Sequence, residues 1–227
     1  MNYAAVDAGG NAVVKVEVPA EWANIVVKEE EHTADAARPD FVKKIVDPIN
    51  ALKGDLLPVS AFNGREDGTW DNGTAAYEKR GIAVNVPEWK IGNCIQCNQC
   101  AYVCPHAVIR PFLATEEEAA ASGVEWKQGL GETKEYKFRI QISPMDCTGC
   151  SNCVDVCPAK DKALVMRPLE EQMPQQKNWD YITKNIGYKQ VVDKTKSVKN
   201  LQFAQPLFEF SGACAGCGET PYIKAIS

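Results

Sequence analysis

The chain has 227 residues, of which 45% are hydrophobic, and its formal net charge is −5. The acidic balance argues against nucleic-acid binding, which calls for a basic patch, and no apolar run reaches the roughly 18 to 20 residues of a membrane span. The N-terminus, MNYAAVDAGG, has neither the basic region nor the apolar region of a secretory signal. We therefore expect a cytoplasmic globular protein without a membrane span.

Residues 1–80 contain many turn formers, which predict an irregular N-terminal connecting segment rather than a domain with a large core. One helix is expected from Asp40 to about Asp47, ended by Pro48. Its apolar face would consist of Phe41, Val42, Ile45 and Val46. A small independent domain is the alternative interpretation of this part.

Two later stretches follow one cysteine pattern. NCIQCNQCAYVCP (residues 93–105) and DCTGCSNCVDVCP (residues 146–158) both place Cys at i, i+3, i+6 and i+10, with Pro directly after the last. This is the bacterial two-cluster ferredoxin spacing, in which the fourth Cys of each run binds the other 4Fe-4S cluster. We predict a first quartet of ligands, Cys94, Cys97, Cys100 and Cys157, and a second quartet, Cys147, Cys150, Cys153 and Cys104.

Zinc and disulfides are the other common uses of such cysteines. A structural zinc site usually has two Cys-x2-Cys pairs separated by a spacer, and a third Cys followed by Cys-Pro has no use there. Disulfides need an oxidising compartment, to which no secretory signal directs this chain. Of the two histidines, His32 reads as a surface residue, and His106 as a neighbour of the cluster or an exposed group rather than a ligand.

Residues 81–169 form an internal duplication. AVIRPFL (107–113) follows the first motif and ALVMRPL (163–169) follows the second, each with an Arg-Pro pair. The duplication predicts an α+β fold of the two-cluster ferredoxin type, with pseudo-twofold symmetry. Short strands would pair into small sheets over the cluster loops, and a turn of helix would follow each fourth Cys.

An insertion separates the two halves. Thr115 and Glu118 make a capping-box pattern before a short Ala-rich helix. KEYKFRIQI (134–142) alternates polar and apolar residues, as a half-buried strand does. The insertion is therefore expected to contain one helix and one strand.

The tail holds the last two cysteines, in GACAGCGETPY (residues 212–222). Two thiolates cannot complete a metal site. Cys214 and Cys217 are therefore either a local redox pair or half of a third site whose other ligands lie in sequence not present here.

At this point the residues resemble a known family. YEKRGIAVNVPEW (residues 77–89) leads into the first motif, and GACAGCGETPY follows the second; this combination resembles an internal segment of pyruvate:ferredoxin (flavodoxin) oxidoreductases. The resemblance implies an EKR-type connecting segment over 1–80, a dicluster ferredoxin domain over 81–169, and over 170–227 a connector and the truncated start of an α/β domain that binds thiamine diphosphate. It also implies that Cys214 and Cys217 are half of a third 4Fe-4S cluster and that Glu219 contacts thiamine diphosphate.

The resemblance further implies a place in anaerobic pyruvate metabolism. The complete enzyme, expected to be a homodimer with thiamine diphosphate and Mg²⁺, would convert pyruvate and coenzyme A to acetyl-CoA and carbon dioxide. Its clusters would pass electrons one at a time to ferredoxin or flavodoxin, and this segment would have no catalytic residue of its own. The alternatives are an oxidoreductase for another 2-oxoacid and a stand-alone dicluster electron carrier.

Overall fold

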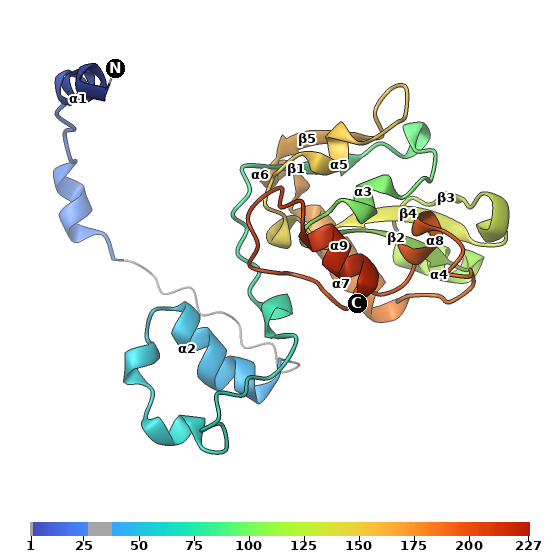
Figure 1. Ribbon diagram of the computed structural model, residues 1–227, viewed down its shortest axis with the longest axis horizontal. Helices are drawn as coiled ribbons and strands as arrows, with labels where there is room; N and C mark the ends of the chain where they lie inside the picture. Colours follow the sequence, from blue (N-terminus) through green and yellow to red (C-terminus); the bar gives the residue numbers. More distant parts are fainter. Residues whose placement is uncertain (1, 27–37) are drawn as a thin grey trace.

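The computed structural model describes residues 2–26 and 38–227. Before the cysteine motifs lie α1 (Asn2–Asn11), the 3-10 helix η1 (Ala20–Asn24), the π-helical turn η2 (Val42–Val46), α2 (Asp47–Asn50) and the 3-10 helices η3 (Gly54–Leu56), η4 (Val59–Phe62) and η5 (Thr74–Tyr77) (Figure 1). Both α1 and η1 bury none of their side chains. Within the described residues, no helix combines the length and apolar character needed to cross a membrane.

The helix expected after Asp40 is present, but the prediction of its end was wrong. Val42, Ile45 and Val46 are buried as expected, whereas Pro48 lies at the start of α2 and the helix continues to Asn50. The wide π-helical turn η2 precedes Pro48, so the proline ring takes a first-turn position, where no N–H is required.

Side chains of residues 38–78 make their own set of contacts. Phe41 packs edge-on against Trp70, with ring centroids 4.8 Å apart, and the Arg65 guanidinium lies 4.1 Å from the Phe41 centroid. Arg38 donates two hydrogen bonds of 2.8 Å to the carboxylate of Asp47. The boundary between this part and its neighbours stays a prediction.

Two small antiparallel sheets frame the cysteine motifs (Figure 1). In one sheet β1 (Asn85–Trp89) pairs with β5 (Leu164–Pro168). In the other, β2 (Ile109–Ala114) pairs with β4 (Lys137–Ile142), which also pairs with β3 (Lys127–Gln128). Each sheet thus joins the strand before one motif to the strand after the other, and this exchange produces the pseudo-twofold symmetry predicted from the duplication.

The helical turns of the motifs lie earlier than predicted. The 3-10 turns η6 (Ile91–Asn93) and η8 (Pro144–Asp146) precede the first Cys of each motif, and α3 (Gln99–Tyr102) and α5 (Asn152–Asp155) contain the third. Both helices end before the fourth Cys, so the expectation of a helical turn after that residue was wrong. The physical reason is the following proline, which disfavours helical backbone at the residue before it.

The insertion contains the expected helix and strand. α4 (Glu116–Ser122) begins with a complete capping box, because Thr115 Oγ1 accepts from the Glu118 N–H and the Glu118 carboxylate accepts from the Thr115 N–H. The 3-10 helix η7 (Gly131–Thr133) leads to β4. Phe138, Ile140 and Ile142 are buried as predicted. Gln141 on the opposite face is buried too, because a later helix covers this face of the strand. The Gln141 amide donates to the Gln175 carbonyl of that helix.

Helices follow the duplicated part: α6 (Leu169–Gln172), α7 (Pro174–Asn185), α8 (Val198–Leu201) and α9 (Thr220–Ile226). One group of buried apolar side chains lies around the two sheets, and a second lies under α7, where Phe112 and Trp179 meet edge to face. The mixture of short helices and antiparallel strands agrees with the predicted α+β class. The start of a further α/β domain after residue 170 stays a prediction.

Candidate metal centres

The thiols of the first quartet line one cavity. Its wall includes the side chains of Trp89, Ile95 and Ile140. The four thiols in that wall are Cys94, Cys97, Cys100 and Cys157. Three of them come from the first motif and the fourth comes from the end of the second.

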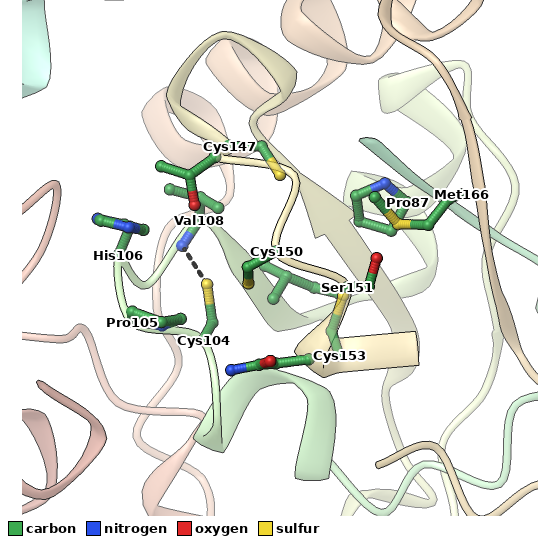
Figure 2. A pocket seen from close by; sticks show the side chains of 13 residues that line it. Pro87, Cys104, Pro105, His106, Val108, Cys147, Cys150, Ser151, Cys153 and Met166 are labelled. Carbon is green, nitrogen blue, oxygen red and sulfur yellow. Dashed lines mark hydrogen bonds between the residues drawn. The ribbon is translucent and has the colours of Figure 1, made fainter. Parts of the chain in front are cut away.

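The thiols of the second quartet line a similar cavity. Figure 2 shows their side chains arranged around a common space, with Pro87 and Met166 on one side and Val108 on the other. The four thiols are Cys104, Cys147, Cys150 and Cys153. Here three thiols come from the second motif and the fourth comes from the end of the first motif.

The grouping is the one that cross-ligation requires, and the sheets explain it. Because β1 pairs with β5 and β2 pairs with β4, the end of each motif is returned beside the start of the other. The helices α3 and α5, which carry the third Cys of each motif, also contact each other. Bonding of iron to these thiols stays a prediction.

Both cavities suit a soft, all-sulfur site. All eight thiols are free, and burial, followed by neighbouring thiols, raises the pKa of Cys100 and Cys153. Burial likewise raises the pKa of Cys147 to about 12. The raised pKa values favour the protonated form of Cys100, Cys147 and Cys153, so a soft metal that binds their thiolates would have to displace these three protons. The donor set fits two 4Fe-4S clusters.

Backbone N–H groups point at three of the sulfur atoms. The N–H groups of Val108 and Ala163, each just beyond a fourth Cys, donate to Cys104 Sγ (3.4 Å) and Cys157 Sγ (3.3 Å). The N–H of Gly149 donates to Cys147 Sγ at 3.4 Å. Hydrogen bonds to cluster sulfur are one means by which a protein sets the reduction potential.

The motif backbones repeat an unusual conformation. The second residue after the first Cys has positive φ in both halves, 59° at Gln96 and 71° at Gly149, and so does the fourth, 59° at Asn98 and 66° at Ser151. A Cβ added to Gly149 would lie 2.9 Å from the Asn85 carbonyl oxygen. Glycine is therefore required at position 149, because left-handed backbone and a close backbone neighbour coincide there.

Gln96 adopts the same backbone conformation because its side chain is anchored. It is buried, its amide donates to the Gln128 carbonyl at 2.7 Å, and its side-chain oxygen accepts from the Leu130 N–H at 3.1 Å. These two bonds tie the first motif to β3 and to Leu130, two residues beyond it. The spacing of the cysteines alone could not indicate this partner.

His106 is buried beside the second cavity. Its Nδ1 lies 2.9 Å from the Ser211 carbonyl oxygen, which makes Nδ1 the protonated nitrogen in the neutral ring. His106 therefore connects the wall of the cavity to the tail, in agreement with the expectation that it neighbours the cluster. His32 lies outside the described residues.

The tail cysteines lie outside both cavity walls. Cys214 and Glu219 are exposed, and Cys217 is partly exposed. The N–H groups of Thr220 and Glu219 lower the pKa of Cys217. A Cβ placed on Gly216 would lie 3.6 Å from Cys150 Cβ, so the loop between the two tail cysteines packs against the second quartet.

A lysine ammonium meets the carbonyl of the fourth Cys in both motifs. Lys162 Nζ donates to the carbonyls of Asp155 (2.9 Å) and Cys157 (2.8 Å). Lys224 Nζ donates to the carbonyls of Ala101 (2.5 Å) and Cys104 (3.2 Å). Burial lowers the pKa of Lys224 to about 8, an effect that the charge of Cys104 opposes.

Neither lysine was predicted from the sequence to contact a cysteine motif. Lys162 lies only five residues after Cys157, so its position in the sequence could have indicated a contact with the turn at that Cys. Lys224 lies 120 residues after Cys104, and no local pattern links them.

Two family models match the chain. Residues 93–160 match a 4Fe-4S dicluster domain, which indicates two 4Fe-4S clusters and spans all eight motif cysteines. Residues 27–83 match EKR, a domain of unknown function.

Curated relatives match the whole chain. It is 49% identical to a pyruvate-flavodoxin oxidoreductase of Enterobacter agglomerans and 51% identical to the pyruvate:ferredoxin oxidoreductase of Moorella thermoacetica, covering 100% of this chain and 19% of each relative. It is 44% identical to the mitochondrial pyruvate dehydrogenase [NADP(+)] of Euglena gracilis, of which it covers 12%. The chain thus spans about a fifth of the length of the first two relatives. It carries a 4Fe-4S dicluster domain and corresponds, over its whole length, to one segment of the pyruvate:ferredoxin (flavodoxin) oxidoreductases.

Proposed function

We propose that this chain is the electron-transfer segment of a pyruvate:ferredoxin (flavodoxin) oxidoreductase. The observation that carries the proposal is the arrangement of eight free thiols in two adjacent cavities, four to each, with one thiol of each quartet supplied by the other motif. The identity to relatives of that name over the whole chain supports the same assignment. The complete enzyme would join pyruvate and coenzyme A in the reaction that yields acetyl-CoA and carbon dioxide.

The residues of this chain would hold and tune the one-electron carriers. The first and second quartets would bind one 4Fe-4S cluster each, and those clusters, together with thiamine diphosphate and Mg²⁺ elsewhere in the enzyme, supply the redox chemistry. Buried side chains such as Val108 and Ile140 keep water from the thiols. The N–H groups of Val108, Gly149 and Ala163 donate to sulfur and favour thiolate.

The tail suggests which quartet faces the electron source. Cys214 and Cys217 would be half of a third cluster site, and Glu219 would contact thiamine diphosphate. Gly216, between the two cysteines, lies against Cys150 of the second quartet. We therefore assign the second quartet to the side of the thiamine and the first to the side of the acceptor, ferredoxin or flavodoxin. The half-exposed Ile95 in the wall of the first cavity agrees with an outlet there.

A stand-alone dicluster carrier is the weaker proposal. It would need the duplicated part but neither the matched EKR segment nor the tail cysteines, and both are included in the matches to the oxidoreductases. The partners of the complete enzyme, a homodimeric assembly, and its cytoplasmic location belong to the same proposal. The acceptor deserves a direct test, because relatives of this chain include enzymes named for NADP⁺.

Metal analysis and activity test the proposal in two steps. Anaerobically purified protein should contain about eight iron and eight sulfide in the two clusters of this chain, and stoichiometric zinc with little sulfide would overturn it. The complete enzyme should then reduce ferredoxin or flavodoxin when pyruvate and coenzyme A are both present. Reduction that needs no pyruvate, or that proceeds only with another 2-oxoacid, would contradict the substrate assignment.

A further inference from the structure

The two halves of the duplication differ in how the turn at the fourth Cys is stabilised. Four residues, Ala159 to Lys162, separate Pro158 from Ala163, whose N–H donates to Cys157 Sγ, and the ammonium of Lys162 meets the Cys157 carbonyl. Two residues, His106 and Ala107, separate Pro105 from Val108. The shorter loop of the first half therefore contains no lysine that could donate to the Cys104 carbonyl as Lys162 does to the Cys157 carbonyl.

The tail supplies the missing ammonium. Lys224 of α9 donates to the carbonyls of Ala101 and Cys104, at the end of α3, as Lys162 does at the end of α5. Helix carbonyls at a C-terminus carry partial negative charge and are stabilised by a cation. The same local interaction is thus made by a neighbouring residue in one half and by the tail in the other.

The two lysines differ in exposure. Lys162 is exposed, and Lys224 is partly buried. A charge in contact with water is screened strongly, whereas one inside the protein acts through a lower effective dielectric constant. Lys224 should therefore influence the clusters more than Lys162 does, although both contact the backbone of a predicted ligand.

We propose that Lys224 is a positioning residue for the second quartet: its ammonium fixes the turn that ends at Cys104 and raises the reduction potential of the cluster held there. Adding an electron makes a thiolate-bound cluster more negative, so a nearby cation stabilises the reduced form. Because Lys224 belongs to α9, seven residues after Cys217, docking of the tail sets the potential of the cluster next to it. The inference rests on the proposed function only in requiring that both clusters are present.

Potentiometric titration of the cluster-loaded protein, followed by electron paramagnetic resonance, tests this role. Lys224→Met and Lys224→Gln should both lower a midpoint potential, while Lys224→Arg should keep it near the wild-type value. Lys224→Gln is the decisive variant, because its amide can still donate to the carbonyls but carries no charge. Lys162→Met is the matched control and should give a clearly smaller shift.

The outcomes separate this inference from the proposed function. Iron and sulfide are measured first, and a wild-type protein without clusters would overturn the function itself. If Lys224→Gln holds its full iron and sulfide and keeps wild-type potentials, the proposed role of Lys224 is wrong. A shift in Lys162→Met as large as that in Lys224→Gln would also overturn it, because burial would then have no influence.

Discussion

Arg110 and Glu209, ninety-nine residues apart in sequence, form an ion pair between β2 and the segment just before the tail cysteines. The Arg110 side chain is only 5% exposed, and its guanidinium lies 4.9 Å from the ring centroid of Trp179 and 5.3 Å from that of Phe210. It also donates to the Tyr188 hydroxyl. A single arginine of the duplicated Arg-Pro pair therefore joins β2 to α7 and to the segment that carries the tail cysteines.

Replacement of this arginine should destabilise the protein strongly. Arg110→Met removes one partner of a largely buried pair and should cost roughly 2 to 4 kcal/mol of unfolding free energy, because Glu209 is left without its cation. Urea unfolding under anaerobic conditions measures the change. Arg167, the other arginine that precedes a proline in a strand after a cysteine motif, is the control: it is 46% exposed and pairs with Glu88, so Arg167→Met should cost less than about 1 kcal/mol. Equal losses in the two variants would contradict the role assigned to Arg110.

Gly149→Ala should damage the second cavity. The new Cβ would meet the Asn85 carbonyl at 2.9 Å, and the backbone has φ of 71°; together these should cost about 1 to 3 kcal/mol. Iron content and the thermal midpoint of unfolding should both fall. Gly92, just before Cys94, has open space around its Cβ position, and Gly92→Ala should leave both quantities near wild type.

Cross-ligation predicts which cluster each fourth Cys supports. Cys104→Ala should reduce the iron content from about eight to about four per chain, with loss of the cluster held by the second quartet. Cys157→Ala should remove the other cluster instead. Spectra of the two variants should therefore be complementary. Loss of the cluster held by Cys94, Cys97 and Cys100 in Cys104→Ala would show that each motif closes on itself.

The tail cysteines should change their reactivity with context. Cys214 is exposed in this chain and Cys217 is partly exposed, so both should react readily with an alkylating reagent, and the lowered pKa of Cys217 favours its reactive thiolate. In the complete enzyme a third cluster should protect them. Mass spectrometry of the alkylated peptides reports both states, with the cysteines of the two quartets as protected controls in cluster-loaded protein.

Function in the complete enzyme gives a second readout for the tail. Replacement of both Cys214 and Cys217 by Ser should slow pyruvate-dependent reduction of ferredoxin and remove about four iron. Glu219→Ala should weaken the binding or activation of thiamine diphosphate while all the clusters remain. An enzyme that loses both tail cysteines and still has three clusters with normal turnover would refute the role proposed for this motif.

The sequence by itself determined the features that depend on short spacing. The cysteine intervals indicated two four-thiol sites, the repeated Arg-Pro strands indicated a duplication, and Thr115 with Glu118 indicated a capping box, which the structure confirms. The capping box joins residues only three positions apart, so local geometry is sufficient for it. The grouping of the cysteines was predicted because their intervals are those of two-cluster ferredoxins, in which the fourth Cys of each run binds the other cluster. Two predictions from local rules were wrong. Pro48 was expected to end a helix but lies in the first turn of α2, and the helical turns expected after Cys104 and Cys157 lie before these residues.

Only the tertiary structure decided which distant residues surround the sites. The fold covers both faces of β4, places Lys224 at the Cys104 turn and packs Gly216 against Cys150. These contacts join residues that are many positions apart, and they form because burial of apolar side chains brings the elements together. No spacing in the sequence encodes them, because each depends on how several elements pack at once.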